Sequence, residues 1–169
     1  MAHILERVTT VFSPEEDRIR IAGARQDGQQ VVIWVTRRLL GFLLPHLLQR
    51  LDGQFASTPP ELRDTMQEFA QQTARSALGE SAPVVAAQDD EVLLASAIDI
   101  GQTEVGVLLT FRDGGEKSFS LPLASENLRQ WLHILYQADR AANWQLPQWP
   151  AWLTGETGAA GAGSSLSLH

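Results

Sequence analysis

One local pattern occurs at two places in this chain and constrains the fold more than any other feature of the sequence. An Asp-Gly turn signal lies between strand-like runs at Asp27-Gly28 and again 86 positions later at Asp113-Gly114. Each copy leads into an apolar helix pattern, which begins at Thr36 in the first copy and at Ser125 in the second. Asp-Gly between alternating apolar runs is a strong β-hairpin signal. The pattern predicts an α+β fold in which two pseudo-symmetric β-β-β-α units form an antiparallel sheet with helices packed on it.

The two units and the segment between them account for most of the 169 residues. We place the repeat units at about residues 2–52 and 91–142. A linking helix is predicted at 58–78, because Thr58-Pro59-Pro60-Glu61 supplies a capping pattern with proline in the first turn. A chain of this length fits one domain. We therefore expect a single α+β domain over residues 1–154.

Leucines occupy nearly every side of the first helix pattern between residues 39 and 51. A two-layer domain covers only one face of a helix well, so this surface calls for additional cover. We therefore predict a homo-oligomer that self-associates through this helix about a two-fold axis. Pro45 lacks the amide that would bond the carbonyl of Gly41, which predicts a kink or a break between these two residues.

The linking helix carries a narrow apolar stripe made of Leu62, Met66, Phe69 and Ala70, with Ala77 further along. Glutamine and charged residues fill most of the remaining positions. This pattern is typical of a helix that lies on the protein surface. The glycine at position 79 predicts its end.

Three of the five tryptophans, Trp144, Trp149 and Trp152, lie within nine residues that also contain Pro147 and Pro150. The prolines exclude a regular helix or a central strand here. We expect this segment to form a C-terminal strap that packs on the domain. The alternative is a recognition surface, because aromatic residues concentrate at protein interfaces. Residues 155–169 are rich in Gly, Ala and Ser and predict a flexible tail.

The sequence lacks the residue patterns of common catalytic and cofactor sites. The chain has no cysteine, which excludes disulfides, thiolate catalysis and Cys-ligated metals. The histidines have no ligand spacing with one another or with a carboxylate on the same helix: His3, His46, His133 and His169. No nucleophile elbow or phosphate-binding loop is present. We therefore predict no catalytic residues, no metal and no cofactor.

Two groups of carboxylates are left open by the sequence. Asp89-Asp90-Glu91 precedes a strand and reads as a solvated linker, with cation binding or acid–base chemistry as the alternative. Asp99 lies inside an apolar strand, on the opposite face from its apolar neighbours. An enzyme that uses one of these carboxylates is the third functional hypothesis.

Charge is distributed unevenly along the chain, whose net charge is −7. Residues 57–91 contain two basic and seven acidic groups. Nucleic-acid binders gain affinity by neutralising phosphates, so nucleic acid is not the expected partner. Four arginines of the first unit are candidates for binding an acidic partner: Arg18, Arg20, Arg37 and Arg38. The alternative for them is a set of exposed arginines with little energetic effect.

No apolar run in the sequence is long enough to span a bilayer, and the N-terminus lacks the pattern of a secretory signal. Together with the absence of cysteine, these features lead us to expect a cytoplasmic protein that does not bind a membrane.

The stretch Phe119-Ser-Leu-Pro-Leu, followed eight residues later by Trp131, resembles the sheet-plus-helix modules of the Whirly and PUR single-stranded nucleic-acid binders. The resemblance covers residues 104–137 and is topological. Those modules have four strands and basic, aromatic sheet faces, whereas three strands are expected here in an acidic chain. The resemblance implies single-stranded nucleic-acid binding as the alternative function, and no functional residue is transferred.

These observations favour a non-enzymatic interaction protein. We expect an accessory or structural subunit of a protein assembly, itself a homo-oligomer, with a protein partner that the sequence does not identify. Arg18, Arg20, Arg37, Arg38 and the strap tryptophans are the candidate partner-binding residues.

Overall fold

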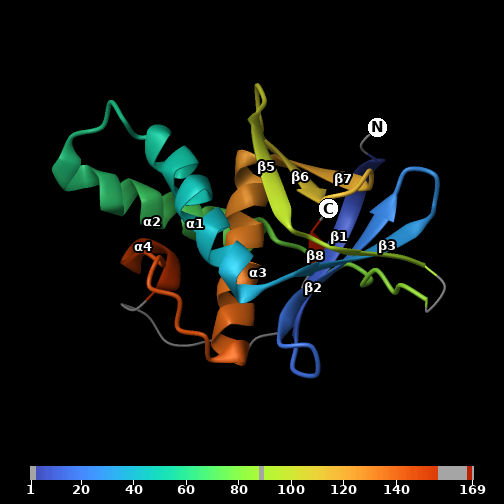
Figure 1. Ribbon diagram of the computed structural model, residues 1–169. Helices are drawn as coiled ribbons and strands as arrows, with labels where there is room; N and C mark the ends of the chain where they lie inside the picture. The colour runs from blue at the N-terminus through green and yellow to red at the C-terminus, as the bar shows by residue number, and fades with distance from the viewer. Residues whose placement is uncertain (1–2, 88–89, 156–166, 169) are drawn as a thin grey trace.

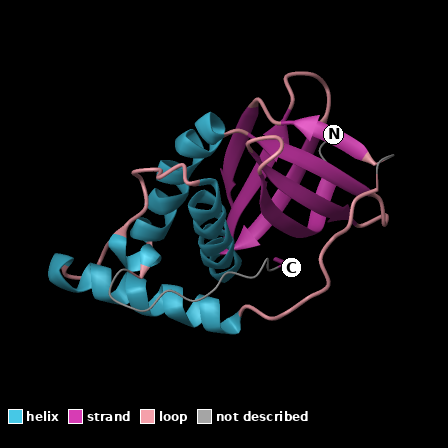
Figure 2. Cartoon of the chain, turned by 90° about the horizontal axis from the view of Figure 1, so that it is seen from below, coloured by secondary structure: helices cyan, strands magenta, loops and turns pink. Residues whose placement is uncertain are grey.

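The structure, a computed structural model, describes residues 3–87, 90–155 and 167–168 (Figure 1). The strands are β1 (His3–Ser13), β2 (Arg18–Arg25), β3 (Gln30–Val35), β4 (Glu91–Leu94), β5 (Ala97–Gln102), β6 (Gly106–Arg112), β7 (Ser118–Ala124) and β8 (Ser167–Leu168). The helices are α1 (Arg37–Gly53), α2 (Pro60–Ala77), α3 (Ser125–Ala142) and α4 (Ala151–Thr154). The helices gather on one side of a curled sheet, as Figure 1 and Figure 2 both show.

The sheet is mixed, so the prediction of an antiparallel sheet is wrong. Its main strand order is β4-β3-β2-β1-β7-β6-β5, with β8 beside β1. The pairs β1–β7 and β3–β4 are parallel, and the remaining neighbours are antiparallel. Hairpin signals fix only antiparallel neighbours. The two parallel pairs are set by long connections through helices, which carry no local turn signal.

The sheet is curled, and the strands at its two ends, β4 and β5, follow each other directly in the chain (Figure 2). Only Ala95 and Ser96 separate β4 from β5. The amide of Ala95 donates to the carbonyl of Trp34 in β3 at 2.9 Å, and the next amide, of Ser96, donates to the carbonyl of Arg112 in β6 at 2.7 Å. The apolar run around Asp99 therefore forms two strands, and each of them pairs with a different neighbour.

The helices do not pack as two pseudo-symmetric units, which corrects the second part of the predicted fold. α1 lies against β5, whereas α3 packs across β1, β6 and β7. α2 packs on α3 and α4. The two aligned helix starts also differ. The hydroxyl of Thr36 accepts the Leu39 amide at 3.2 Å and caps α1, whereas Ser125 is the first residue of α3 and its hydroxyl donates to the carbonyl of Val105 at 3.3 Å.

All the leucines of α1 are buried within the chain itself: Leu39, Leu40, Leu43, Leu44, Leu47, Leu48 and Leu51. The helix therefore offers no leucine surface for self-association, contrary to the prediction, and Phe42 is its exposed large apolar residue. A kink or a break was expected near Pro45; the break is absent, since α1 is continuous. The side-chain amide of Gln148 donates to the carbonyl of Gly41 at 3.2 Å and replaces the donor that Pro45 lacks.

The strap tryptophans pack against the domain. Trp144 is buried, donates its indole N–H to Asp17 at 3.1 Å and meets Phe12 edge to face. Trp149 donates to the buried carboxylate of Asp139 at 2.7 Å. Trp149 also meets Tyr136 edge to face, so both of these indoles have an apolar contact and a polar partner. The predicted flexible tail lies mostly outside the described residues.

Candidate functional site

The orientation of α2 is the most unusual feature of the structure. A surface helix normally turns its apolar stripe toward the core. Here Leu62, Met66 and Phe69 are 51%, 41% and 68% exposed. Gln67 and Gln71 are buried instead, at 2% and 1% exposure. The polar side of α2 thus faces the protein body, and its apolar side faces outward.

Hydrogen bonds to backbone carbonyls explain why glutamine lies on the buried side. Gln67 Nε2 donates to the carbonyl of Leu51 in the last turn of α1 at 2.9 Å. Gln71 Nε2 donates to the carbonyl of Arg129 in α3, also at 2.9 Å. In return, Gln130 of α3 donates to the carbonyl of Ala74 at 2.9 Å. These bonds satisfy the side-chain N–H groups of the three glutamines, whereas Gln71 Oε1 is buried without a hydrogen-bond partner.

A buried arginine of α3 completes the polar contacts on the buried side of α2. These contacts, made by Gln67, Gln71, Arg129 and Gln130, are called the seat of α2. Arg129 is 3% exposed and donates from Nη2 to Gln67 Oε1 at 2.7 Å and to Gln54 Oε1 at 2.9 Å. Its guanidinium also lies 5.6 Å from the ring centre of Trp152. Burial lowers the pKa of Arg129 to about 10, and the nearby carboxylate of Asp52 opposes this shift. Because the guanidinium has donors only, it requires the acceptors that the α2 glutamine supplies.

These polar contacts of α2 were not predicted from the sequence, although the sequence contains a signal for them. Gln67 and Gln71 are four residues apart and share one side of the helix. On a helix with a narrow apolar stripe, two glutamines at this spacing are compatible with a buried polar contact as well as with a face that lies in solvent.

The exposed stripe has the spacing of a helix-pairing seam. Leu62, Met66 and Phe69 follow one another at intervals of four and three residues, which keeps them on one side of the helix. The positions that border the stripe are mostly small or uncharged: Thr65, Ala70, Gln72 and Ala77. The surface is therefore apolar and largely neutral along its length.

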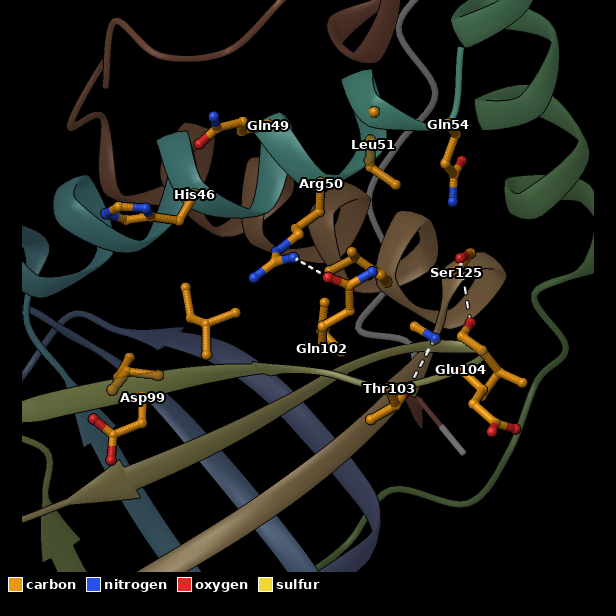
Figure 3. A pocket seen from close by; sticks show the side chains of 17 residues that line it. His46, Gln49, Arg50, Leu51, Gln54, Asp99, Gln102, Thr103, Glu104 and Ser125 are labelled. Carbon is orange, nitrogen blue, oxygen red and sulfur yellow. Dashed lines mark hydrogen bonds between the residues drawn. The ribbon is translucent and has the colours of Figure 1, made fainter. Parts of the chain in front are cut away.

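A cleft of about 1050 Å³ lies between α1 and the β5–β6 hairpin (Figure 3). Arg50 of α1 donates to Gln102 of β5 across it at 2.8 Å. Figure 3 shows Asp99 and Ser125 at opposite ends of the lining. The carboxylate of Asp99 is exposed and pairs with Arg112, and the Ser125 hydroxyl is bonded to a backbone carbonyl. The Asp99 carboxylate and the Ser125 hydroxyl are therefore not brought together as the base and nucleophile that nucleophilic catalysis needs.

The other open carboxylates also have structural partners. The side chain of Asp90 accepts the amide of Ala87, and Glu91 lies 3.7 Å from Arg25. Asp89 lies outside the described residues. Over residues 3–87, 90–155 and 167–168, no group of three or more His, Asp or Glu side chains is placed to hold a metal ion.

The four candidate arginines lie near one end of the sheet but differ in their contacts. Ile19 pairs with Val35, the last residue of β3. Arg18 therefore lies near the start of α1, which begins two residues after Val35. Arg37 donates to the carbonyl of Trp144 at 3.1 Å and thereby holds the strap. The Arg38 guanidinium lies 5.6 Å from the ring centre of Phe42.

Arg20 lies opposite Trp34 across β2 and β3, and Trp34 lies opposite Leu94 of β4. These residues alternate with buried ones, such as Ile33, and therefore lie on the outer face of the sheet.

Comparisons of the chain with protein-family models, curated proteins and solved structures gave no match. Among the described residues, no helix has the length and apolar character needed to cross a membrane.

Proposed function

We propose that this chain is a non-enzymatic interaction protein, an accessory or structural subunit that docks through the exposed stripe of α2. The observation that carries this proposal is the exposure of Leu62, Met66 and Phe69 on a helix whose polar side is buried. The proposed occupant is an amphipathic helix with a neutral apolar stripe, which fits the seam spacing and the uncharged borders.

Energetics support a docking role for this surface. Burying one large apolar side chain contributes roughly 1.5–3 kcal/mol. A seam of Leu62, Met66 and Phe69 therefore contains enough apolar surface to drive a weak to moderate association, after the cost of bringing two molecules together. The same three side chains contribute little to the stability of the isolated domain, because they remain largely in water.

The proposal can be tested with a photo-reactive phenylalanine analogue placed at Phe69 of the full chain in its native cells. Val105 is the matched control, because it is 69% exposed against 68% for Phe69. We expect an adduct from position 69 that is lost when Leu62→Asp is added, and whose cross-linked site maps to a helix. No adduct at position 69, or equal adducts at both positions, would contradict the proposal.

Single-stranded nucleic-acid binding is the second candidate, and one observation favours it. Arg20 and Trp34 are direct neighbours on the outer face of the sheet. A cation beside an aromatic ring can bind a phosphate while a base stacks on the ring. The net charge of −7 opposes this candidate. Titration with an unstructured oligonucleotide should show salt-dependent binding that Trp34→Ala weakens; salt-independent quenching or no binding would exclude it.

A further inference from the structure

We infer that the helix that occupies the α2 stripe belongs to a second copy of this chain, so that two α2 helices pair in antiparallel fashion about a two-fold axis. This inference rests on the proposed docking role of α2. It identifies the partner and places the two-fold contact on α2 instead of α1.

The seam is complementary to itself. In an antiparallel pair centred between positions 66 and 69, Met66 of one copy lies opposite Phe69 of the other, and the reverse contact forms at the same time. Leu62 then lies opposite Thr73 of the second copy, so each end of the seam pairs an apolar residue with a small one. Polarizable Met against an aromatic ring is a favourable contact at the centre.

The charges on α2 permit this pairing. At about 100° per residue, Glu61, Asp64 and Glu68 lie roughly 110° or more around the helix from the centre of the stripe. The border positions that would face the second copy carry one charge, that of Arg63. Its guanidinium donates to the carbonyls of Thr58 at 2.9 Å and Ala56 at 3.0 Å. No two carboxylates are therefore forced together by the two-fold axis.

The size of the surface sets the expected strength. α2 has 18 residues, so it is about 27 Å long. One helix pair of this length buries less than the roughly 800 Å² per partner of a standard stable interface. The dimer should therefore be weak, with a Kd on the order of 10–100 μM. Each copy carries a net charge of −7, so the copies repel at long range, and added salt should strengthen the dimer by screening this repulsion.

The test is sedimentation equilibrium of the full chain over a concentration range of about 1–300 μM, at low and high salt. We expect a monomer–dimer equilibrium that Phe69→Ser weakens at least about tenfold. Val105→Ser is the matched control of equal exposure and should leave the Kd unchanged. Far-UV circular dichroism and a thermal melt establish that each variant is folded.

A charge-pair experiment tests the antiparallel arrangement itself. Phe69→Glu alone and Met66→Lys alone should each be monomeric. A mixture of the two should form a heterodimer, because Glu at 69 meets Lys at 66 while the unmodified Met66 and Phe69 still meet on the other side of the axis. A homodimer of either variant, or a mixture that stays monomeric, would overturn the antiparallel pairing.

Failure of this inference can be distinguished from failure of the proposed function. If the unmodified chain is monomeric throughout the concentration range, the second copy is not the occupant. The docking role of α2 then still stands if the adduct from position 69 maps to a helix of a different protein. If position 69 gives no adduct either, both the inference and the proposed function are wrong. A dimer that survives Phe69→Ser would place the contact elsewhere and overturn the inference alone.

Discussion

α1 and α2 follow each other in the chain and have nearly the same length, 17 and 18 residues, yet they use their side chains in opposite ways. α1 buries every leucine it has, whereas α2 exposes its large apolar residues and buries glutamine. The difference arises from what each helix packs against. α1 meets apolar side chains of the core, while α2 meets backbone carbonyls and a buried guanidinium. Which side of an amphipathic helix is buried therefore depends on the groups that the helix packs against as well as on its own apolar stripe.

The largest expected effect comes from the strap, which contacts both helices. Gln148 bonds to α1, and α4 packs on α2. A chain that stops after Asn143 loses three buried side chains, Trp144, Leu146 and Leu153. At roughly 1.5–3 kcal/mol each, this should cost at least about 5 kcal/mol and lower the melting temperature by several degrees or more. Hydrogen exchange should accelerate more in α2 than in α1.

A chain that stops after Thr154 is the control for the strap and should melt at nearly the temperature of the full chain. Equal losses in the two truncated chains would show that the residues after 154 are structural. If neither truncation changes the melting temperature, the tryptophans do not anchor the domain.

A direct comparison of the two helices uses one leucine from each. Leu44 is 0% exposed and Leu62 is 51% exposed. Leu44→Ala should lower the free energy of unfolding by about 2–5 kcal/mol, because it opens a cavity in the core. Leu62→Ala should change it by less than about 0.5 kcal/mol under dilute conditions. Urea denaturation measures both values, and similar losses at the two positions would mean that α2 has its apolar side buried in solution.

Acid should destabilise the folded chain through His133 of α3. Burial lowers the pKa of His133 from 6.5 to about 4, and the positive charge of Arg75 on α2 adds to this effect. Because the unfolded chain binds a proton at higher pH than the folded one, the free energy of unfolding should fall as the pH drops from about 6.5 toward 4. The loss attributable to this group should reach at most about 3 kcal/mol.

The pH effect is checked by unfolding curves of the unmodified chain and of His133→Gln. The variant should show a smaller slope between these pH values, since it has no proton to gain. Arg75→Gln should move the pKa of His133 upward, as measured by NMR. A slope that is identical with and without His133 would assign the acid sensitivity to other groups.

The smallest expected effect comes from a comparison of a buried and an exposed glutamine on α2. Gln67→Ala removes an acceptor of the buried Arg129 and the donor to the Leu51 carbonyl, and should cost about 2 kcal/mol. Gln72→Ala changes an exposed residue on the same helix and should be nearly neutral. If Gln72→Ala is the more damaging of the two, the orientation of α2 described above is wrong.

Local features of the fold were accessible from the sequence, while long-range pairings were not. Thr36 was recognised as a helix start from its type and position, and its hydroxyl does accept the Leu39 amide. The parallel pairing of β1 with β7 joins His3 and Ile4 to Phe119 and Ser120. No turn signal encodes such a contact, and the repeated local pattern pointed to a symmetry that helix packing does not follow.

Pro122 shows how a correct rule can give a wrong position. Proline cannot donate to a central ladder, so a strand that contains proline normally lies at a sheet edge or ends at the proline. β7 instead lies between β6 and β1. The conflict is avoided because β1 pairs with β7 only at Phe119 and Ser120, so the pairing of these two strands stops before Pro122. The candidate site was missed for a related reason: sequence patterns show which residues share a side of α2, but not which side meets the core.

The two-residue connection between β4 and β5 has a consequence for behaviour at high concentration. Open sheet edges present unpaired N–H and C=O groups that recruit further chains and lead to aggregation. In this protein the strands at both ends of the sheet are continuous through Ala95 and Ser96, whose own amides bond to β3 and β6. β4 and β5 each keep one unpaired side, but the two-residue connection divides this edge into short runs of four and six residues, which limits its use as a template for a further strand. We therefore expect no growth into fibres when the protein is concentrated for crystallisation.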